Sequence, residues 1–446
     1  MGILQRMKSF RSMAVAGLLA AVLVQACGYR APLHASDIPE VSEESFYPGV
    51  RNDYQELAAL LAKDTGMEPS TGNTVGLITD QHQKLELLLN DVREAQQSIY
   101  IDHYRFCYDS CGSMVADLMI EKAEAGKDMR IIIDRGAHNK AYMAGHAPIL
   151  DSKVDLRYFR IPVMLIDYLS LAQSTHRDHR KFVILDGTTA YMGGRNIQDR
   201  YFETWRDADI RVTGPVVNDL LSTFNENQFR VAPERDPLPL QPEETLRESA
   251  TRDTVPGLTQ FYGKTLQIIP DSPTDQRLPI RNAFLWSIEH AQHYFWFYNP
   301  YTPPPAQIMK ALKQAAARGV DVRWIAPNNN DVKPEAWMGE SLYKELLKAG
   351  IRIYEYLGPV LHAKQFMVDD YLTCIGSANM DNLSFFLNYE VQSLVYDEAF
   401  TRHATAIFEQ DLTDHCHEIT LEEVKHWSFF RKMRNWLVRV FAGPLA

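Results

Sequence analysis

The spacing of hydrophobic and polar residues predicts two similar blocks of alternating helices and strands. The first block holds two segments with helical spacing and three apolar runs typical of strands, in the order 85–95, 98–104, 113–125, 129–134 and 154–159. The second block repeats this order, at 283–291, 294–298, 307–318, 320–326 and 351–356. Such alternation predicts an α/β fold class in which helices cover a sheet, duplicated within one chain.

Composition and turn residues divide the chain around these blocks. We expect a leader, a tether, a first lobe, a linker, a second lobe and a C-terminal helix, at residues 1–26, 27–75, 76–230, 231–257, 258–420 and 421–446. The linker holds five prolines and nine charged residues, which is typical of a segment that runs over the surface. The tether is mixed polar, with one short helix expected at 54–63.

One stretch lies at the end of each block and occurs twice, at residues 179–207 and 362–390. Both copies follow the pattern H-x-K-x4-D-x6-G-(G/S)-x-N, and one constant offset relates all equivalent positions, with no gap between the copies. The matched pairs are His179/His362, Lys181/Lys364, Asp186/Asp369, Gly193/Gly376, Gly194/Ser377, Asn196/Asn379 and Asp207/Glu390. A strand hairpin, the simplest alternative for each copy, does not need these side chains at matched places in two distant segments.

Two further H-x-K triplets test how specific this pattern is. They begin at His82 and His138, and neither continues into the Asp and the G-x-x-N. We expect both to be surface features without a catalytic role. The specificity therefore lies in the long pattern and its repetition.

The repeated residue types suit displacement at a phosphodiester. An imidazole can attack phosphorus and form a covalent phosphohistidine, which splits one difficult step into two. A second imidazole can protonate the departing alcohol and later deprotonate the incoming one. Two lysines and two asparagines can stabilise the negative charge that develops on the non-bridging oxygens, so the chemistry requires no metal ion or other cofactor.

The twofold pattern resembles the phospholipase D superfamily. The resemblance implies a duplicated α/β/α sandwich of two pseudo-symmetric lobes with the active site between them. It implies His179 as nucleophile and His362 as acid/base, although the near symmetry of the copies leaves the order open. It places Lys181, Lys364, Asn196, Asn379, Gly194 and Ser377 around the phosphate, Asp207 and Glu390 as the carboxylates that orient the imidazoles, and Asp186 and Asp369 as structural parts of the motif.

The N-terminus has the features of an export signal. Three basic residues and no acid precede an apolar run over 13–24, which is short for a membrane span. The run ends in Leu23-Val24-Gln25-Ala26-Cys27-Gly28, which resembles a bacterial lipoprotein cleavage box with Cys27 as the lipidated residue. We expect a periplasm-facing lipoprotein, with Gly28 favouring the outer membrane; an uncleaved anchor is the alternative.

The net charge and its distribution along the chain favour some partners over others. The net charge is −11, and removal of the leader's +3 leaves −14, which disfavours nucleic acid as a partner. Residues 425–441 form the one strongly basic tract, with five basic residues and no acid. Helical spacing places Trp427, Phe430, Met433, Leu437 and Val440 on one face, with Ser428, Lys432, Asn435 and Arg439 opposite. This pattern is typical of a helix in an anionic membrane surface, and a terminal helix docked on the second lobe is the alternative.

Two local features have open interpretations. An apolar insertion at 161–172, close before His179, either lines a groove for acyl chains or forms a small helix packed on the first lobe. Cys107 and Cys111 lie close together in a loop-like stretch, where export would allow a disulfide.

The words GGRNIQDRYF and DADIRVTGPVV around the first motif resemble bacterial cardiolipin synthases of the phospholipase D type. That resemblance implies an enzyme that transfers a phosphatidyl group from one phospholipid to an alcohol, with phosphatidylglycerol as the expected acceptor. We expect a monomer, although the sequence leaves the oligomeric state open. A hydrolase that releases phosphatidic acid would share every motif, because the acceptor depends on pocket shape and water exclusion. A nuclease of the same fold is disfavoured by the acidic charge, and an inactive lipid-binding protein by the intact motifs.

Overall fold

The computed structural model describes residues 46–159, 176–301 and 304–442. A single sheet runs through both blocks, with strand order β16-β12-β11-β10-β13-β14-β15-β9-β1-β8-β7-β6-β2-β3-β4, and β5 pairs with β15 outside this path. The two halves of the order correspond, because β4-β3-β2-β6-β7-β8-β1 has the same arrangement as β12-β11-β10-β13-β14-β15-β9. The pair β1–β9 at the centre therefore joins two pseudo-symmetric lobes into one sheet.

The strands have the following bounds: β1 Ser70–Ile78, β2 Ser98–His103, β3 Asp128–Asp134, β4 Asp155–Phe159, β5 Arg177–Asp178, β6 Lys181–Leu185, β7 Thr189–Gly193, β8 Asp209–Thr213, β9 Gln260–Asp271, β10 Tyr294–Tyr298, β11 Asp321–Pro327, β12 Arg352–Tyr356, β13 Gln365–Val368, β14 Leu372–Gly376, β15 Asn388–Tyr396 and β16 Cys416–Ile419. In each lobe three strands are parallel, and the motif hairpin (β6–β7 or β13–β14) adds antiparallel strands. Every strand expected from the hydrophobic pattern is present.

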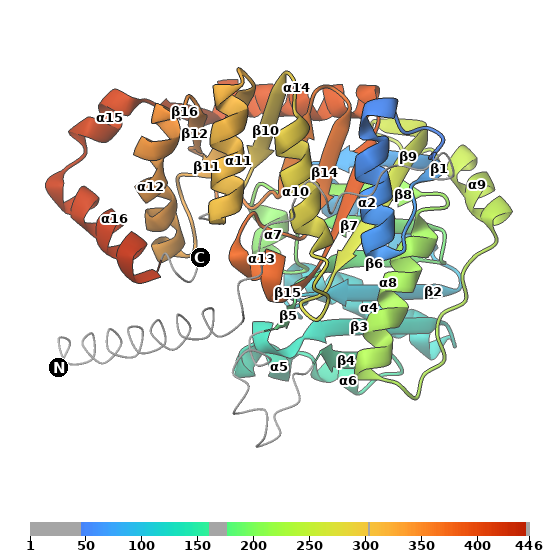
Figure 1. Ribbon diagram of the computed structural model, residues 1–446. Helices are drawn as coiled ribbons and strands as arrows, with labels where there is room; N and C mark the ends of the chain where they lie inside the picture. Colours follow the sequence, from blue (N-terminus) through green and yellow to red (C-terminus); the bar gives the residue numbers. More distant parts are fainter. Residues whose placement is uncertain (1–45, 160–175, 302–303, 443–446) are drawn as a thin grey trace, which may run out of the picture.

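The helices have the following bounds: η3 Asn52–Tyr54, α2 Gln55–Thr65, α3 Gln81–Glu94, α4 Ser110–Glu124, η4 Arg135–Ala137, α5 Lys140–Gly145, α6 Ala147–Leu150, α7 Asp199–Glu203, α8 Val217–Val231, α9 Glu243–Arg252, α10 Pro279–His290, α11 Ala306–Ala317, α12 Lys333–Lys348, α13 Asn382–Phe386, α14 Glu398–His415, α15 Leu421–His426 and α16 Phe429–Ala442. The four helices expected in the two blocks correspond to α3, α4, α10 and α11, and Figure 1 labels the last three.

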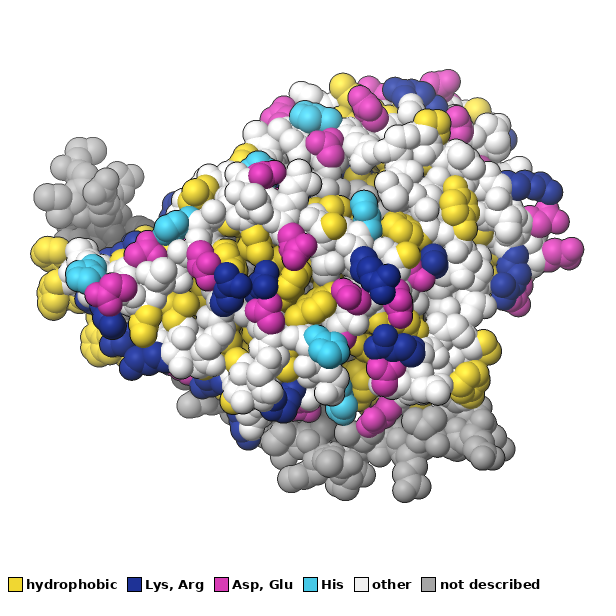
Figure 2. All heavy atoms as spheres, turned by 90° about the horizontal axis from the view of Figure 1, so that it is seen from above, with side chains coloured by type: hydrophobic (Ala, Val, Ile, Leu, Met, Phe, Trp, Pro, Cys, Tyr) yellow, Lys and Arg dark blue, Asp and Glu magenta, His cyan; other side chains and the backbone are white. Residues whose placement is uncertain are grey.

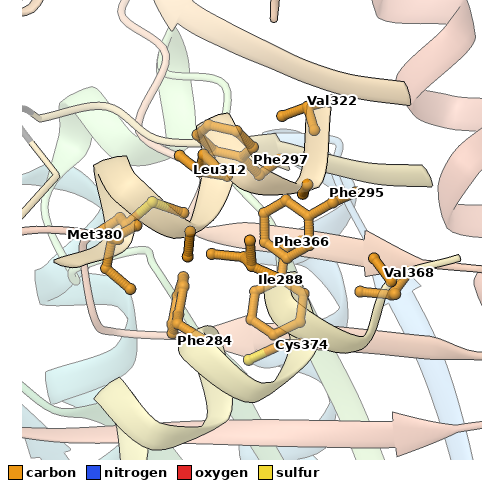
Figure 3. Close-up of a cluster of buried hydrophobic side chains, with 14 of the residues drawn as sticks. Phe284, Ile288, Phe295, Phe297, Leu312, Val322, Phe366, Val368, Cys374 and Met380 are labelled. Carbon is orange, nitrogen blue, oxygen red and sulfur yellow. The ribbon is translucent and has the colours of Figure 1, made fainter. Parts of the chain in front are cut away.

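Alternating side chains place a hydrophobic core on each face of the sheet. Along β10, Phe295 and Phe297 enter a core under α10 and α11, whereas Trp296 and Tyr298 enter the core on the other face. Figure 3 shows the first of these cores, where Phe284 and Ile288 of α10 meet Phe366 of β13. Helices on both faces confirm the predicted α/β/α sandwich, because only a sheet covered on both sides hides such strands from water.

The short helix expected at 54–63 is present as α2, but the expectation that residues 27–75 form an extended tether is wrong where the structure describes this segment. Helix α2 buries Leu57, Ala58 and Leu61 in the core of the second lobe, and β1 pairs with β8 on one side and β9 on the other. The first lobe therefore starts at β1, before the expected residue 76. Strand β1 escaped the sequence pattern because its first half, Ser70 to Asn73, contains no large apolar residue.

Residues 231–257 connect the lobes but are not a bare surface linker. Helix α9 buries Leu246 and Ala250. The Thr74 hydroxyl of β1 donates to the Ala250 carbonyl oxygen at 2.8 Å. This segment therefore packs on the strand that joins the lobes. The predicted leader, Cys27 and the insertion at 161–172 lie outside the described residues.

Candidate active site

The two motif histidines lie where the lobes meet, and the main chain of each is held by the opposite lobe. The His179 N–H donates to the Tyr389 carbonyl oxygen at 2.9 Å, and the His362 N–H donates to the Arg206 carbonyl oxygen at 2.7 Å. The pairing of β5 with β15 and the bridge between Arg206 and Leu361 extend these contacts. In each motif one residue separates His from Lys at the start of a strand, so both side chains lie on one face.

The carboxylates are exchanged between the lobes. His179 Nδ1 donates to Glu390 Oε1 at 2.8 Å and Oε2 at 3.0 Å, and His362 Nδ1 donates to Asp207 Oδ2 at 2.7 Å. Each histidine therefore bonds to the acid of the other motif, not to the acid that ends its own. A carboxylate on Nδ1 fixes the ring and leaves Nε2 for the reacting group.

Glu390 is buried among hydrogen-bond donors. Besides His179, it accepts from the Ser377 hydroxyl at 2.6 Å, the Ser384 hydroxyl at 2.8 Å and the Asn388 side chain at 3.3 Å. Burial raises the pKa of Glu390, but His179, Lys181 and Ser377 outweigh it and bring this pKa down to about 2. Glu390 is therefore a stable anion in the site.

Asp207 is equally buried but has fewer hydrogen-bond donors around it. Apart from His362, its carboxylate accepts from the Ala208 N–H at 2.8 Å. Burial raises the pKa of Asp207, and Lys364 and Arg195 oppose this only in part. The pKa of both histidines is lowered by burial; that of His362 is lowered further, and Lys364 and Lys181 add to the effect.

The two lysines are buried at the centre of the site. Burial lowers the pKa of Lys181 to about 7 and that of Lys364 to about 8, and both carboxylates oppose the shift. Lys364 Nζ lies 2.9 and 3.1 Å from the two ring nitrogens of His362. A phosphate anion between these ammonium groups would receive charge stabilisation in a site with little water.

Four other motif residues were expected around the phosphate, and two of them are turned elsewhere. The Gly194 N–H donates to the Ala208 carbonyl oxygen, and the Ser377 N–H donates to that of Val391. Since the Ser377 hydroxyl donates to Glu390, neither residue has a donor left for a phosphate, and the expectation for both is wrong. Asn196 and Asn379 are buried in the site; the Asn196 carboxamide oxygen accepts from the Arg105 N–H at 3.1 Å, which leaves the NH₂ end as donor.

Asp186 and Asp369 bind main chain outside the catalytic centre. Both adopt a positive φ, near 50°, at the hairpin turn. Asp186 accepts from the N–H groups of Gln96, Gln97 and Ser98, and Asp369 accepts from those of Gln292, His293 and Tyr294. Each carboxylate thus holds the start of the neighbouring strand, β2 or β10, against the hairpin.

Aromatic side chains surround the histidines unequally, and the motif search did not find them. Tyr201, Trp205 and Tyr301 lie around the His362 ring, with centroid distances of 5.2, 5.3 and 5.6 Å. Tyr104 packs on the edge of the His179 ring at 4.8 Å. A comparison of the two motif copies would have singled out Tyr201 and Trp205, because their equivalents in the second copy are Ser384 and Asn388.

Two smaller expectations, for His138 and for the pair Cys107 and Cys111, are wrong. His138 is buried and bonded to the carbonyl oxygens of Asp134 and Phe106, so it is not a surface residue. Cys107 and Cys111 are buried free thiols, not a disulfide. Within residues 46–159, 176–301 and 304–442, no group of three or more His, Cys, Asp or Glu side chains could hold a metal ion.

A duplicated α/β/α sandwich with a His–Lys pair from each lobe at their junction defines the phospholipase D superfamily. Residues 88–227 and 285–412, more than half of the chain, match the family described as "Cardiolipin synthase, PLD-like domain". The chain therefore belongs to the PLD-like cardiolipin synthase family, which confirms the resemblance seen in the motifs.

Individual relatives agree with this assignment. The chain is 31% identical to a cardiolipin synthase of Geobacillus sp. (strain WCH70), over 81% of this chain and 71% of that protein. It is 28% identical to cardiolipin synthase 2 of Staphylococcus epidermidis (strain ATCC 35984), over 80% of this chain and 72% of that protein. The crystal structure of phosphatidylserine synthase from Haemophilus influenzae Rd KW20 shares the fold, with a TM-score of 0.64 at 14% identity over 83% of this chain and 92% of that chain.

Proposed function

We propose that the protein transfers a phosphatidyl group from one phospholipid to the terminal glycerol hydroxyl of phosphatidylglycerol, through a phosphohistidine on His179. The enzyme class follows from the family: the chain is a cardiolipin synthase-type phosphatidyltransferase of the phospholipase D superfamily. The observation that carries the proposed mechanism is the pair of exchanged His–carboxylate contacts, with two lysines between them.

In the first step His179 Nε2 attacks phosphorus, and the bond from phosphorus to the leaving alcohol breaks. His362 acts here as imidazolium: it keeps the Nδ1–H that is bonded to Asp207 and gives its Nε2 proton to that alcohol. The negative charge of the bound phosphate favours this protonated form and opposes the lowering of the His362 pKa by burial. The phosphorylated ring of His179 carries positive charge, which the Glu390 anion stabilises through Nδ1–H. Lys181 and Lys364 stabilise the charge on the phosphoryl oxygens.

In the second step His362 takes the proton of the incoming alcohol, whose oxygen attacks phosphorus. The bond from phosphorus to His179 breaks, and the ring leaves as neutral imidazole. Both histidines return to their starting states, and no proton is gained or lost overall.

The unequal surroundings favour His179 as nucleophile. Its carboxylate partner is held as an anion by three further donors, as a cationic intermediate requires. His362 is the more buried ring, with 3% of its side chain exposed against 12% for His179, and it lies among three aromatic rings. An acid/base group in that position handles the alcohol where water is restricted.

The direct test is incubation with labelled phosphatidylglycerol, followed by mass spectrometry of the lipids. The expected products are cardiolipin and glycerol. Phosphatidic acid without cardiolipin would identify a hydrolase and overturn the proposed acceptor. Trapped enzyme should carry the phosphatidyl group, bonded through phosphorus, on a peptide that contains His179.

Three properties of the working enzyme belong to the same proposal. We propose lipidation at Cys27 and a position on the periplasmic side of the cell envelope, supported by the sequence at 23–28. Cell fractionation of wild type and C27S tests both. We propose that the monomer is active, since both His–carboxylate contacts form within one chain. A membrane surface is the proposed partner, because the substrates of this enzyme class are phospholipids.

A further inference from the structure

Helix α16 is attached to the second lobe by its polar side. Asn435, 4% exposed, donates to Glu340 of α12 at 2.9 Å, and Arg431 and Arg434 bind the same carboxylate oxygen at 2.9 and 2.5 Å. One turn further along, Arg439 binds Glu345 at 2.9 Å. The helix is therefore held on α12 by charges and hydrogen bonds.

The opposite side of α16 is apolar and faces away from the protein. Its large apolar side chains are strongly exposed: Phe429 71%, Phe430 74%, Met433 40%, Trp436 60%, Leu437 39% and Val440 47%. Figure 2 shows hydrophobic side chains beside basic ones at the left edge of the molecule, where Figure 1 places α15 and α16. A surface helix normally turns its apolar stripe inward, so this orientation is the reverse of the usual one.

The sequence pattern identified the amphipathic helix but only part of its apolar face. Trp427, expected on that face, precedes α16 and packs partly against the core of the second lobe, while Arg431 lies 3.8 Å over its ring. Phe429 and Trp436 complete the outward face instead. The docked alternative is therefore confirmed for the polar side of the helix, whereas its apolar side is left uncovered by the described residues.

The charge around this face is positive although the whole chain is acidic. Arg431 and Arg434 share the single carboxylate of Glu340, which leaves one net positive charge. Arg439 and Lys313 share Glu345, which leaves a second. The Lys432 ammonium, bonded to the Lys425 carbonyl oxygen, adds a third.

We propose that the outward face of α16, Phe429 to Val440, docks on an anionic phospholipid bilayer with its aromatic rings at the level of the head groups. This inference rests on the proposed function, because the phospholipid substrates of such an enzyme reside in a bilayer. Apolar rings bordered by positive charge match an anionic interface. A second copy of this face would bring three positive charges against three others, which disfavours it as the occupant.

Flotation with vesicles tests the proposal. The protein begins at residue 28, so that neither the apolar leader nor lipidation of Cys27 masks the effect. One set of vesicles contains phosphatidylglycerol with phosphatidylcholine, and the other contains phosphatidylcholine alone. The double variant F429S/F430S is compared with F229S, because Phe229 of α8 is equally exposed at 71%. We expect at least about tenfold weaker binding of the double variant to the anionic vesicles, and unchanged binding of F229S. Binding of the unsubstituted protein to the anionic vesicles should weaken with added salt, because salt screens its positive charges.

Activity assays separate the possible failures. The double variant should lose activity on vesicles and keep it on a short-chain, monomeric phospholipid. Equal loss on both substrates would show that the face belongs to the fold, and equal flotation of both variants would show that it does not meet the membrane; either result overturns the docking. Loss of a dimer in F429S/F430S would also overturn it, in favour of a second copy. Vesicle binding that depends on Phe429 and Phe430, without transfer activity in wild type, would retain the docking and reject the proposed reaction.

Discussion

The two His–carboxylate contacts are made from equivalent positions but have opposite surroundings. Ser377, Ser384 and Asn388 donate to Glu390, whereas Gly194, Tyr201 and Trp205 occupy the equivalent places beside Asp207 and His362. The three residues of the second copy all donate hydrogen bonds to Glu390. In the first copy, Tyr201 and Trp205 instead place aromatic rings beside His362. The duplicated site is thus chemically divided, although its topology is symmetric.

Gly194 and Ser377 show how tightly each carboxylate is packed against the residue at this position. A Cβ at Gly194 would lie 2.1 Å from Asp207 Oδ1, so the aspartate fits only because that side chain is absent. At the equivalent place Ser377 is tolerated, and its hydroxyl bonds to Glu390. The choice of acid and the choice of neighbour are therefore coupled in each half of the site.

Replacement of the two histidines should give the largest contrast. H179A is expected to abolish both turnover and covalent adduct, because the nucleophile is removed. H362A should slow turnover by about 10²–10⁴-fold, the usual contribution of an acid/base group, and still trap phosphohistidine. Mass spectrometry of acid-quenched enzyme detects the adduct, and an adduct on His362 in H179A would reverse the assignment.

Exchange of the neighbouring residues should affect the two halves unequally. In G194S the added side chain displaces Asp207 and frees the His362 ring, and loss of a properly oriented imidazole costs on the order of 10²–10⁴-fold in kcat. S377G removes one of several donors to Glu390 and should cost about tenfold or less. Steady-state measurement of kcat for G194S and S377G tests this prediction. Similar losses of kcat in the two variants would contradict unequal roles for the two halves of the site.

The carboxylates should differ in their effect on stability. The pKa of Glu390 falls from an ordinary 4.5 to about 2, so its ionisation stabilises the fold by on the order of 3 kcal/mol above pH 4.5. That contribution is lost as the pH falls towards 2. The pKa of Asp207 is raised, so its ionisation opposes folding. E390Q should therefore melt at a lower temperature than D207N at pH 7, with a gap that narrows below pH 4.5; a constant gap in calorimetry would exclude the pKa difference as its cause.

The smallest expected effect concerns the choice between alcohol and water. W205N gives His362 the residue that the other copy carries at 388, and it opens the wall around the acid/base group. We expect a severalfold larger share of phosphatidic acid relative to cardiolipin, because water reaches the intermediate more easily. W205F keeps an aromatic ring and serves as the control. An unchanged product ratio in W205N would mean that the wall does not exclude water.

Local sequence predicted the fold class, the paired blocks and the residues that meet at the site. The reason is that hydrophobic alternation and a constant offset between two copies are properties of short segments, which can be compared directly. The exchange of Asp207 and Glu390 was not predictable, since each acid follows one histidine in its own motif and bonds to the other. The separation of two residues along the sequence does not show which lobe a side chain contacts.

Other failures have the same origin. Strand β1 and helix α2 belong to the fold because β9 and α10, distant in sequence, cover them. The outward direction of α16 depends on Glu340, a residue of α12 that lies far earlier in the chain. The motif pattern predicted Gly194 and Ser377 near the phosphate. In the structure Gly194 lies against Asp207, and the Ser377 hydroxyl donates to Glu390.

The exchanged acids also restrict how such a protein could have arisen. A half-length ancestor with one histidine and one acid could not have completed a His–carboxylate pair within a single chain. Two identical copies related by a twofold axis would each have supplied the acid for the other, as isologous dimers do. Joining the copies would then have freed each acid and its neighbours to change separately, and the serines around Glu390 and the aromatic rings around His362 are the differences that such freedom permits.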